Sequence, residues 1–417
     1  MMTSLDQNGY TSGNSLSTMT AEELGFKDNH YQSFPIALLN LLNTLIGPEI
    51  LGVGNSIIFC GLSASVILLM FTAFLSYIGT ILILNLQHMV QAESINDMAT
   101  KIVGRWAGQA FSVITLFFTF SNLISYLIVG QETVCSWLTL LHCESWTSGW
   151  KRSLVVLVYA LVLPVALSIP KQMEFIDTAS MFAIVAQLLF VVSMIIKGVK
   201  YFATCSIHPT CEIAVFNINF FNAFSIYSTL FALPAVVLPQ LEPFTPRLKN
   251  RYWLLGLGFV LCYTIDIIPN VIGYLMFGVE TNEILYSSFE HNDPLMQAVR
   301  VGFFFVVNAA YPIVNLQVTT DLSAMIYNLH NPRELTWRKR IVCLLLANVF
   351  PVLVAMVLPN VRPAFEIGGS FGGCLSNFFF PPLLYWKQVN KPWYHPLKIG
   401  LLLFALWGFV AMVIATY

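Results

Sequence analysis

Residues 34–57 read FPIALLNLLNTLIGPEILGVGNSI, an apolar stretch that is interrupted near its middle by Gly47, Pro48 and Glu49. The stretch is long enough to cross a bilayer, which takes about 20 residues of helix. Because proline has no backbone N–H, a helix breaks or kinks there. At membrane depth the freed backbone groups need protein or a water-filled cavity around them. The stretch therefore predicts a broken membrane helix beside a cavity.

The rest of the chain has the composition of a membrane protein. Of its 417 residues, 57% are hydrophobic and only 10% are charged, whereas soluble domains have about 25% charged residues. The net charge of −1 gives no sign of nucleic-acid binding. We predict an all-α membrane protein with 11 transmembrane helices, at 34–57, 62–86, 109–131, 153–169, 176–196, 217–239, 252–275, 298–325, 341–358, 364–385 and 398–416.

The loops between these segments indicate an orientation. If the N-terminus is cytosolic, 14 Lys and Arg residues fall on the inner side and 6 on the outer side. This agrees with the excess of basic residues that cytoplasmic loops carry. We therefore expect residues 1–33, which are polar, to form a flexible cytosolic tail. Residues 34–417 would form the transmembrane domain, with Tyr417 on the opposite side of the membrane.

An odd number of spans has a consequence for symmetry. Segments 1–5 and 6–10 would be inverted copies of each other, and the eleventh helix would be an addition. Segment 6 also carries helix-weakening residues, namely Ser225, Ser228, Thr229 and Pro234. Interruptions at matching positions in the two halves of a transporter point to its substrate site. The alternative is that both helices are merely kinked.

Five short motifs, in order along the chain, resemble those of the amino acid/auxin permease family. The resemblance is strongest to its branch of sodium-coupled neutral amino acid transporters. The motifs are Asn43-Thr44-Leu45-Ile46-Gly47, Ser125-Tyr126-Leu127-Ile128-Val129-Gly130, Phe231-Ala232 with Val237-Leu238-Pro239 and Glu242, Gly273-Tyr274-Leu275-Met276-Phe277-Gly278, and Ala298-Val299-Arg300 with Tyr311-Pro312. The family's usual second glycine in segment 1 is replaced here by Glu49.

The resemblance implies a secondary active transporter of small amino acids that works by alternating access and is not an enzyme. It would use Na⁺ or H⁺ as the coupling ion and no other cofactor. We expect a monomer in the plasma membrane or the vacuolar or lysosomal membrane, with an amino acid and the lipid bilayer as its partners. The alternative is an amino-acid sensor that binds substrate and signals to a cytosolic partner.

Site residues are expected in both interrupted segments and in segment 3. The predicted substrate-binding residues are Thr44, Ile46, Gly47, Pro48, Glu49, Asn122, Ser225, Ser228 and Thr229. The family resemblance also implies a cation site formed with Asn43 and Asn308.

Two carboxylates at membrane depth are candidates for proton coupling, because such groups are costly there and usually functional. Glu49 would carry a proton or bind a cationic amino group, or it would cap free N–H groups in the break. Asp266, in segment 7, would take part in transport or form a structural bond with a neighbouring helix.

Polar residues also recur at steps of three and four in segments 3, 7 and 8, which places each set on one helix face. The sets would line a wetted pathway or form interhelical hydrogen bonds. They are Ser112, Thr115, Thr119, Asn122 and Tyr126; Tyr263, Asp266, Asn270 and Tyr274; and Asn308, Tyr311, Asn315 and Thr319.

Glycines and cysteines give two further expectations. Gly368, Gly369, Gly372 and Gly373 form overlapping small-residue pairs in segment 10, which predict close helix packing. Cys143, Cys205 and Cys211 fall in outer loops, with Cys135 close by, and an oxidising exterior would permit a disulfide among them. Either a bond between the two loops or a local Cys205–Cys211 bond would fit.

Overall fold

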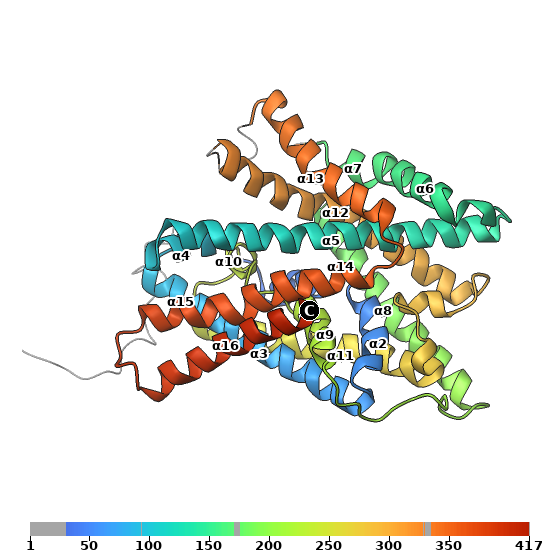
Figure 1. Ribbon diagram of the computed structural model, residues 1–417, viewed down its shortest axis with the longest axis horizontal. Helices are drawn as coiled ribbons and strands as arrows, with labels where there is room; N and C mark the ends of the chain where they lie inside the picture. The colour runs from blue at the N-terminus through green and yellow to red at the C-terminus, as the bar shows by residue number, and fades with distance from the viewer. Residues whose placement is uncertain (1–30, 93, 171–175, 328, 330–334, 417) are drawn as a thin grey trace, which may run out of the picture.

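The computed structural model describes residues 31–92, 94–170, 176–327, 329 and 335–416, and every regular element in these ranges is helical. Most of the helices run along the long axis of the molecule (Figure 1). The α-helices are α1 (Phe34–Leu45), α2 (Ile50–Ser56), α3 (Leu62–Val90), α4 (Ile95–Ile102), α5 (Arg105–Leu140), α6 (Gly149–Val162), α7 (Pro164–Leu167), α8 (Ile176–Phe202), α9 (Phe220–Leu230), α10 (Val237–Leu241), α11 (Leu248–Phe277), α12 (Pro294–Tyr327), α13 (Trp337–Val357), α14 (Arg362–Ile367), α15 (Phe380–Gln388) and α16 (Pro396–Thr416). Shorter or different helices are η1 (Ile57–Phe59), η2 (Glu144–Trp146), η3 (Gly278–Glu280), η4 (Leu285–Ser288) and the π-helix η6 (Gly368–Phe379).

Eight helices in the described part of the chain are long and apolar enough to cross a membrane, and they correspond to eight of the predicted segments. A ninth span is formed if α1 and α2 are counted together. The remaining predicted segments, 217–239 and 364–385, are each divided into shorter helices in the structure. The prediction of a multi-pass helical protein is therefore confirmed, whereas the count of eleven spans stays a prediction.

The interruption in the first segment is real. Helix α1 ends at Leu45, α2 begins at Ile50, and the two are bent by 51°. Pro48 cannot donate the hydrogen bond that the Thr44 carbonyl would receive in a continuous helix. The segment 217–239 is also broken, because α9 ends at Leu230 and α10 begins only at Val237. The first break thus lies where the sequence placed it, whereas in segment 6 only Pro234 lies in the break, and Ser225, Ser228 and Thr229 are helical residues of α9.

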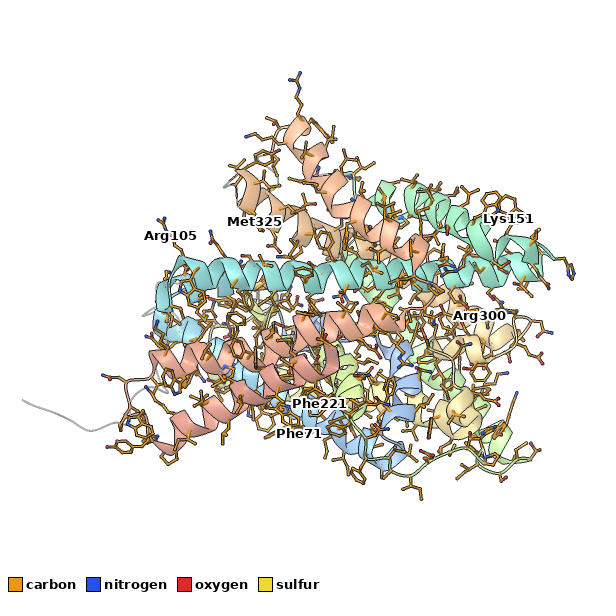
Figure 2. The ribbon with its side chains drawn as sticks, viewed as in Figure 1. Phe71, Arg105, Lys151, Phe221, Arg300 and Met325 are labelled. Carbon is orange, nitrogen blue, oxygen red and sulfur yellow. The ribbon has the colours of Figure 1, made fainter. Side chains whose placement is uncertain are left out.

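Helix α5 is the longest helix and lies at the centre of the molecule. It passes through the middle of the structure with α12, α13 and η6 packed along it (Figure 1). At 1.5 Å per residue its 36 residues extend about 54 Å, more than the roughly 30 Å hydrocarbon core of a bilayer. Figure 2 shows Arg105, predicted on the inner side, and Lys151, predicted on the outer side, at opposite ends of the long axis.

Segment 10 packs as closely as its glycines predict. A Cβ atom added to Gly369 would overlap the backbone of Ser225 on α9, and one added to Gly373 would overlap the Ser228 side chain. One added to Gly372 would overlap Phe118 on α5. Residues 368–379 form a π-helix between these neighbours, a rare geometry that often marks functional sites.

The structure holds no disulfide among the described residues, so the bond suggested for the outer loops stays a prediction. All eight cysteines lie in the described ranges, and all have free thiols. Cys143 and Cys205 are exposed, whereas the Cys211 thiol donates to the Tyr274 carbonyl oxygen at 3.2 Å. The loop that carries Cys211 is instead fastened to α3 by backbone hydrogen bonds from Leu62 and Ser63 to Glu212 and Ile213.

Candidate functional site

A cavity of about 400 Å³ lies at the break in the first span. Its walls come from α1 and the break, α5, α8, the α9–α10 break and α12. The predicted site residues that line it are Asn43, Thr44, Ile46, Gly47, Pro48, Glu49, Asn122 and Thr229. Residues distant in the sequence therefore meet at the two breaks. The apolar wall is completed by α12, with Val306, Ala309, Ala310, Ile313 and Val314.

The only carboxylate in this lining belongs to Glu49, whose side chain is 6% exposed. It folds back over Gly47, so that a Cβ added to Gly47 would overlap one of its carboxylate oxygens. The first residues of α2 make short-range backbone bonds, from Leu51 N–H to the Pro48 carbonyl at 3.1 Å and from Gly52 N–H to the Glu49 carbonyl at 3.0 Å. The break thus presents a carboxylate and a glycine backbone to the cavity.

One freed carbonyl in the break has a partner that sequence reasoning missed. The buried side chain of Gln187, on α8, donates through Nε2 to the Ile46 carbonyl oxygen. The only signal in the sequence was a single amide within the apolar segment 176–196. Its partner could not be inferred, because nothing in the sequence places segment 5 beside the break.

Helix α5 provides the polar wall opposite the break. Thr119, Asn122 and Tyr126 line the cavity together, as their helical spacing predicts. The Thr119 hydroxyl is used within the helix, since it donates to the Thr115 and Leu116 carbonyls at 3.0 Å. The Asn122 Oδ1 atom is buried and has no partner in the described structure. Asn122 is therefore available to a ligand.

Two of the predicted substrate-binding residues do not reach the cavity. Ser225 donates to the Glu366 carbonyl at 2.7 Å, and Ser228 donates to the Gly369 carbonyl at 2.8 Å. Both hydroxyls are directed at segment 10, because the glycines there allow close approach to α9. Thr229 lines the cavity, although its hydroxyl also donates to the Phe365 carbonyl at 3.2 Å.

The two residues implied as a cation site lie in different surroundings. Asn43 lines the cavity, but Asn308 is not among the described residues that do. Asn308 accepts from the Tyr159 hydroxyl at 3.2 Å and donates to the Phe304 carbonyl at 2.7 Å. Its amide is therefore occupied by α6 and by its own helix, and the structure does not bring it to the cavity with Asn43.

Asp266 also lies away from the cavity, on the side of α11 that packs against α2. Its Oδ2 accepts from the Cys262 thiol at 3.2 Å, which is a contact within α11. The bond to the neighbouring helix comes from Asn270, which donates to the Ile50 carbonyl at 2.9 Å. The predicted structural bond to a neighbouring helix is thus made by Asn270 and not by Asp266.

Only the polar set on segment 3 faces this cavity. On α12, Tyr311 and Asn315 both donate to the Asn348 side chain of α13, at 2.9 and 2.8 Å. On α11, Asn270 donates to the Ile50 carbonyl of α2 at 2.9 Å, and the Tyr274 hydroxyl accepts from the N–H of Glu212, in the loop between α8 and α9, at 3.0 Å. The polar residues of segments 7 and 8 therefore bond to neighbouring elements and do not line this cavity.

The cavity extends toward the side on which the described chain begins. Asn43 and Gln317 lie in the halves of their segments that face that side, and Gln240 follows the end of segment 6 on the same side, which the charge bias predicts to be cytosolic. The opposite side is covered by η4, whose Leu285 and Tyr286 are fully buried. The Tyr286 hydroxyl lies 3.1 Å from that of Thr133 on α5.

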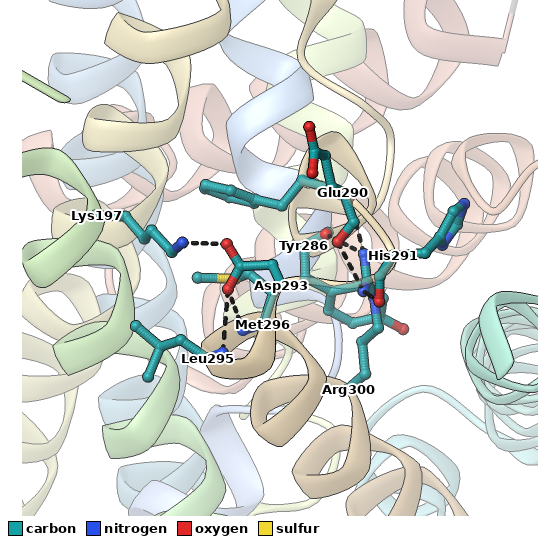
Figure 3. A network of polar contacts seen from close by, with 9 residues as sticks. Lys197, Tyr286, Glu290, His291, Asp293, Leu295, Met296 and Arg300 are labelled. Carbon is teal, nitrogen blue, oxygen red and sulfur yellow. Dashed lines mark hydrogen bonds and ion pairs between the residues drawn. The ribbon is translucent and has the colours of Figure 1, made fainter. Parts of the chain in front are cut away.

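A polar network holds this cover in place (Figure 3). The buried Arg300 donates to the carbonyls of Tyr286 and Phe289, each at 3.0 Å. Asp293 pairs with Lys197 of α8 and accepts from the N–H groups of Leu295 and Met296 at the start of α12. Burial alone would raise the pKa of Asp293, but these hydrogen bonds and the Lys197 charge outweigh it and lower that pKa. The loop that carries η4 is therefore held against α8 and α12 on the predicted outer side.

Comparison with protein families gives one match across nearly the whole described chain. Residues 30–417 match the family model described as "Transmembrane amino acid transporter protein". The match includes both breaks, the cavity and the cover formed by η4.

Proposed function

Because the chain belongs to the transmembrane amino acid transporter family, we propose that it is a secondary active transporter of small amino acids that works by alternating access. The family is one of membrane transporters and not of enzymes. The observation that carries the proposal is the cavity between the two broken segments, with Glu49 and Asn122 in its walls.

The size and polarity of the cavity support a small amino acid as substrate. Its volume of about 400 Å³ is near the lower end for ligand pockets, which run from about 300 to 1,000 Å³. The Glu49 carboxylate and the Oδ1 atom of Asn122, which has no partner in the described structure, suit the ammonium group of an amino acid. Backbone N–H groups near Gly47 suit its carboxylate. The apolar wall of α12 would face the substrate side chain.

The extent of the cavity toward the predicted inner side and the buried η4 on the predicted outer side support alternating access. A transporter that works this way has a central site exposed to one side at a time. We place segments 1–5 and 6–10 in an inverted five-helix repeat, with segment 11 added. Two breaks at corresponding positions, at 46–49 and 231–236, support that assignment. Motion of one repeat against the other would open the outer side by releasing η4.

The coupling ion in this proposal is Na⁺ or H⁺. Asn43 is the cavity residue that would contribute to a cation site. We place the N-terminus in the cytosol and the protein in the plasma membrane or the vacuolar or lysosomal membrane, as a monomer.

The test is uptake of radiolabelled amino acids into proteoliposomes under imposed Na⁺ or pH gradients. We expect concentrative uptake of small neutral amino acids under one of the gradients, and loss of that uptake in Asn122→Leu. Thr115→Val is the matched control, because Thr115 is buried on the same helix and its hydroxyl has no partner in the described structure. Binding without gradient-driven accumulation would contradict the proposal.

A further inference from the structure

The side of α11 behind the broken span holds a carboxylic acid with an unusual environment. Asp266 is 0% exposed, and its Oδ1 has no hydrogen-bond partner in the described structure. Its Oδ2 accepts only from the Cys262 thiol, a weak donor. No ion pair of Asp266 is present among the described residues. An ionised carboxylate buried in this way costs far more than a neutral acid.

One turn further along α11, Asn270 also has a buried oxygen that lacks a hydrogen-bond donor. Its Nδ2 donates to the Ile50 carbonyl at 2.9 Å and to the Asp266 carbonyl at 2.7 Å. Its Oδ1, also buried, has no partner in the described structure. Residues four apart lie on the same helix face. Two acceptor oxygens therefore lie on one buried face, and each lacks a donor. A proton on Asp266 would supply the missing O–H group.

A proton fits this place better than a metal cation. Hard cations take several oxygen ligands, about six or more for Ca²⁺ and Mg²⁺. Here only the two side-chain oxygens lack partners, because the Ile50 carbonyl already accepts the Asn270 amide. A single proton removes the buried charge of Asp266 and provides the donor at the same time.

The connection to the cavity runs through Asn270. Ile50 is the first residue of α2 and follows Glu49 directly in the cavity wall. A Cβ added to Gly54 would lie 3.0 Å from the Asn270 Oδ1, so this side chain packs along a full turn of α2. If Asp266 loses its proton, the negative carboxylate attracts the Asn270 N–H groups. The bond that holds Ile50 is then weakened, and α2 is freed to move.

We propose that Asp266 binds the coupling proton of transport. Through its hydrogen bond to Ile50, Asn270 would couple the protonation state of Asp266 to the position of α2 and so to the substrate cavity. The proposal rests on the transport function proposed above. It assigns H⁺ and not Na⁺ as the coupling ion, and it places the ion on α11 and outside the cavity.

The titratable groups that face Asp266 are Cys262 on its own helix and Glu49 in the break. Helices α1 and α2 carry no titratable side chain. The described titratable side chains on the other elements packed against α11 have no hydrogen bond or ion pair to Asp266; they are Tyr77 and His88 of α3, Lys197, Lys200 and Tyr201 of α8, Glu280 of η3 and Tyr286 of η4.

The experiment compares wild type with Asp266→Asn in proteoliposomes, using the best amino acid from the uptake panel. A one-unit pH gradient can drive up to about tenfold accumulation through one coupled proton. We expect wild type to accumulate substrate under this gradient and to move protons with it, followed by a pH-sensitive dye. Asp266→Asn keeps a donor for Asn270, so it should still exchange internal for external substrate. Its gradient-driven accumulation should fall to about onefold, without proton movement.

Two further variants keep the test decisive if Asp266→Asn fails to fold. Asp266→Glu retains the acid and should shift the pH dependence of uptake without abolishing it. Cys262→Ser keeps a donor to Oδ2 and should preserve proton coupling. Proton-driven accumulation in Asp266→Asn, or a wild type driven by Na⁺ and indifferent to pH, would overturn this proposal alone. A wild type that transports no amino acid would instead overturn the proposed function.

Discussion

Gln187 of α8 donates a hydrogen bond to the carbonyl oxygen of Ile46, at the point where the first span breaks. The relationship shows how a broken backbone is tolerated at membrane depth. The Ile46 carbonyl would accept from the N–H of Ile50 in a continuous helix, but that N–H instead lies 3.4 Å from the Gly47 carbonyl. A side chain from the fifth segment thus replaces a helical bond, which ties α8 to the substrate cavity.

Removing this side chain should destabilise the break. Gln187→Leu leaves the buried Ile46 carbonyl without a donor, and such a group costs about 1–3 kcal/mol. We expect a lower thermal unfolding midpoint in detergent and reduced uptake. Ser193→Ala is the control, since Ser193 is buried on the same helix and its hydroxyl has no partner in the described structure. Equal midpoints for the two variants would show that the hydrogen bond does not support the break.

The predicted topology can be tested at the two ends of the chain. The 14 to 6 division of Lys and Arg residues places the N-terminus in the cytosol, and an odd number of spans places Tyr417 outside. In intact cells or sealed vesicles, an N-terminal tag should be protected from external protease and a C-terminal tag should be cleaved. Equal accessibility of the two tags would mean an even number of spans and would remove the basis for the inverted repeat.

Much of the fold follows from hydropathy, because length and apolar composition suffice to define a membrane helix. Eight predicted segments correspond to single long helices, and Pro48 marks the first break. The short helix α4 was not predicted, although Ser94 caps it by accepting from the Asp97 N–H at 3.1 Å. The π-helix at 368–379 was not predicted either, because it depends on contacts that its glycines make with α5 and α9.

The candidate site was predictable only in part, for a related reason. Helical spacing shows which residues share a face, but it does not show which neighbour that face meets. Asn122 and Asn308 have similar surroundings in the sequence, yet one lines the cavity and the other holds Tyr159. Likewise Ser225 and Thr229 share one face of α9 and both donate to segment 10, but only Thr229 is among the described residues that line the cavity. Locating such partners requires the tertiary structure.

The close packing of segment 10 gives a stability prediction. Gly369→Ala would place a methyl group into the backbone of Ser225, and overpacking of this kind typically costs about 1–3 kcal/mol. We expect a lower unfolding midpoint and weaker uptake. Gly400→Ala is the matched control, because no atom lies within 4 Å of a Cβ at that position on α16. If both variants unfold at the wild-type temperature, segment 10 is more loosely packed than the structure shows.

The two asparagines implied as a cation site should now behave differently. Asn43→Ala removes an amide from the cavity wall, so the ion concentration for half-maximal uptake should rise if a cation binds in the cavity and should stay unchanged if the coupling ion is the proton on Asp266. Asn308→Ala should instead resemble Tyr159→Phe, because each variant removes the same Tyr159–Asn308 hydrogen bond. The measurement is uptake against ion concentration for all three variants. A raised ion requirement in Asn308→Ala but not in Tyr159→Phe would restore Asn308 to the cation site.

Glu49 is the sharpest departure from the family pattern, and its place in the cavity wall suggests two roles. As a cap for free N–H groups of the break, its contribution would be about 0.5–2 kcal/mol, and an amide could partly replace it. As a negative charge facing the substrate, it would favour the ammonium group and any cationic side chain, and no amide could replace it. The two roles therefore separate in the Glu49→Gln variant.

We predict that Glu49→Gln folds and inserts, but changes the preference between neutral and cationic amino acids. If Asp266 holds the coupling proton, the response to a pH gradient should survive in Glu49→Gln while this preference shifts away from cationic substrates. The measurement is uptake against pH for wild type and variant, with neutral and basic amino acids in parallel. Superimposable curves for both substrates would assign Glu49 to capping. A variant that loses its pH response but keeps its preference would instead move the coupling proton from Asp266 to Glu49.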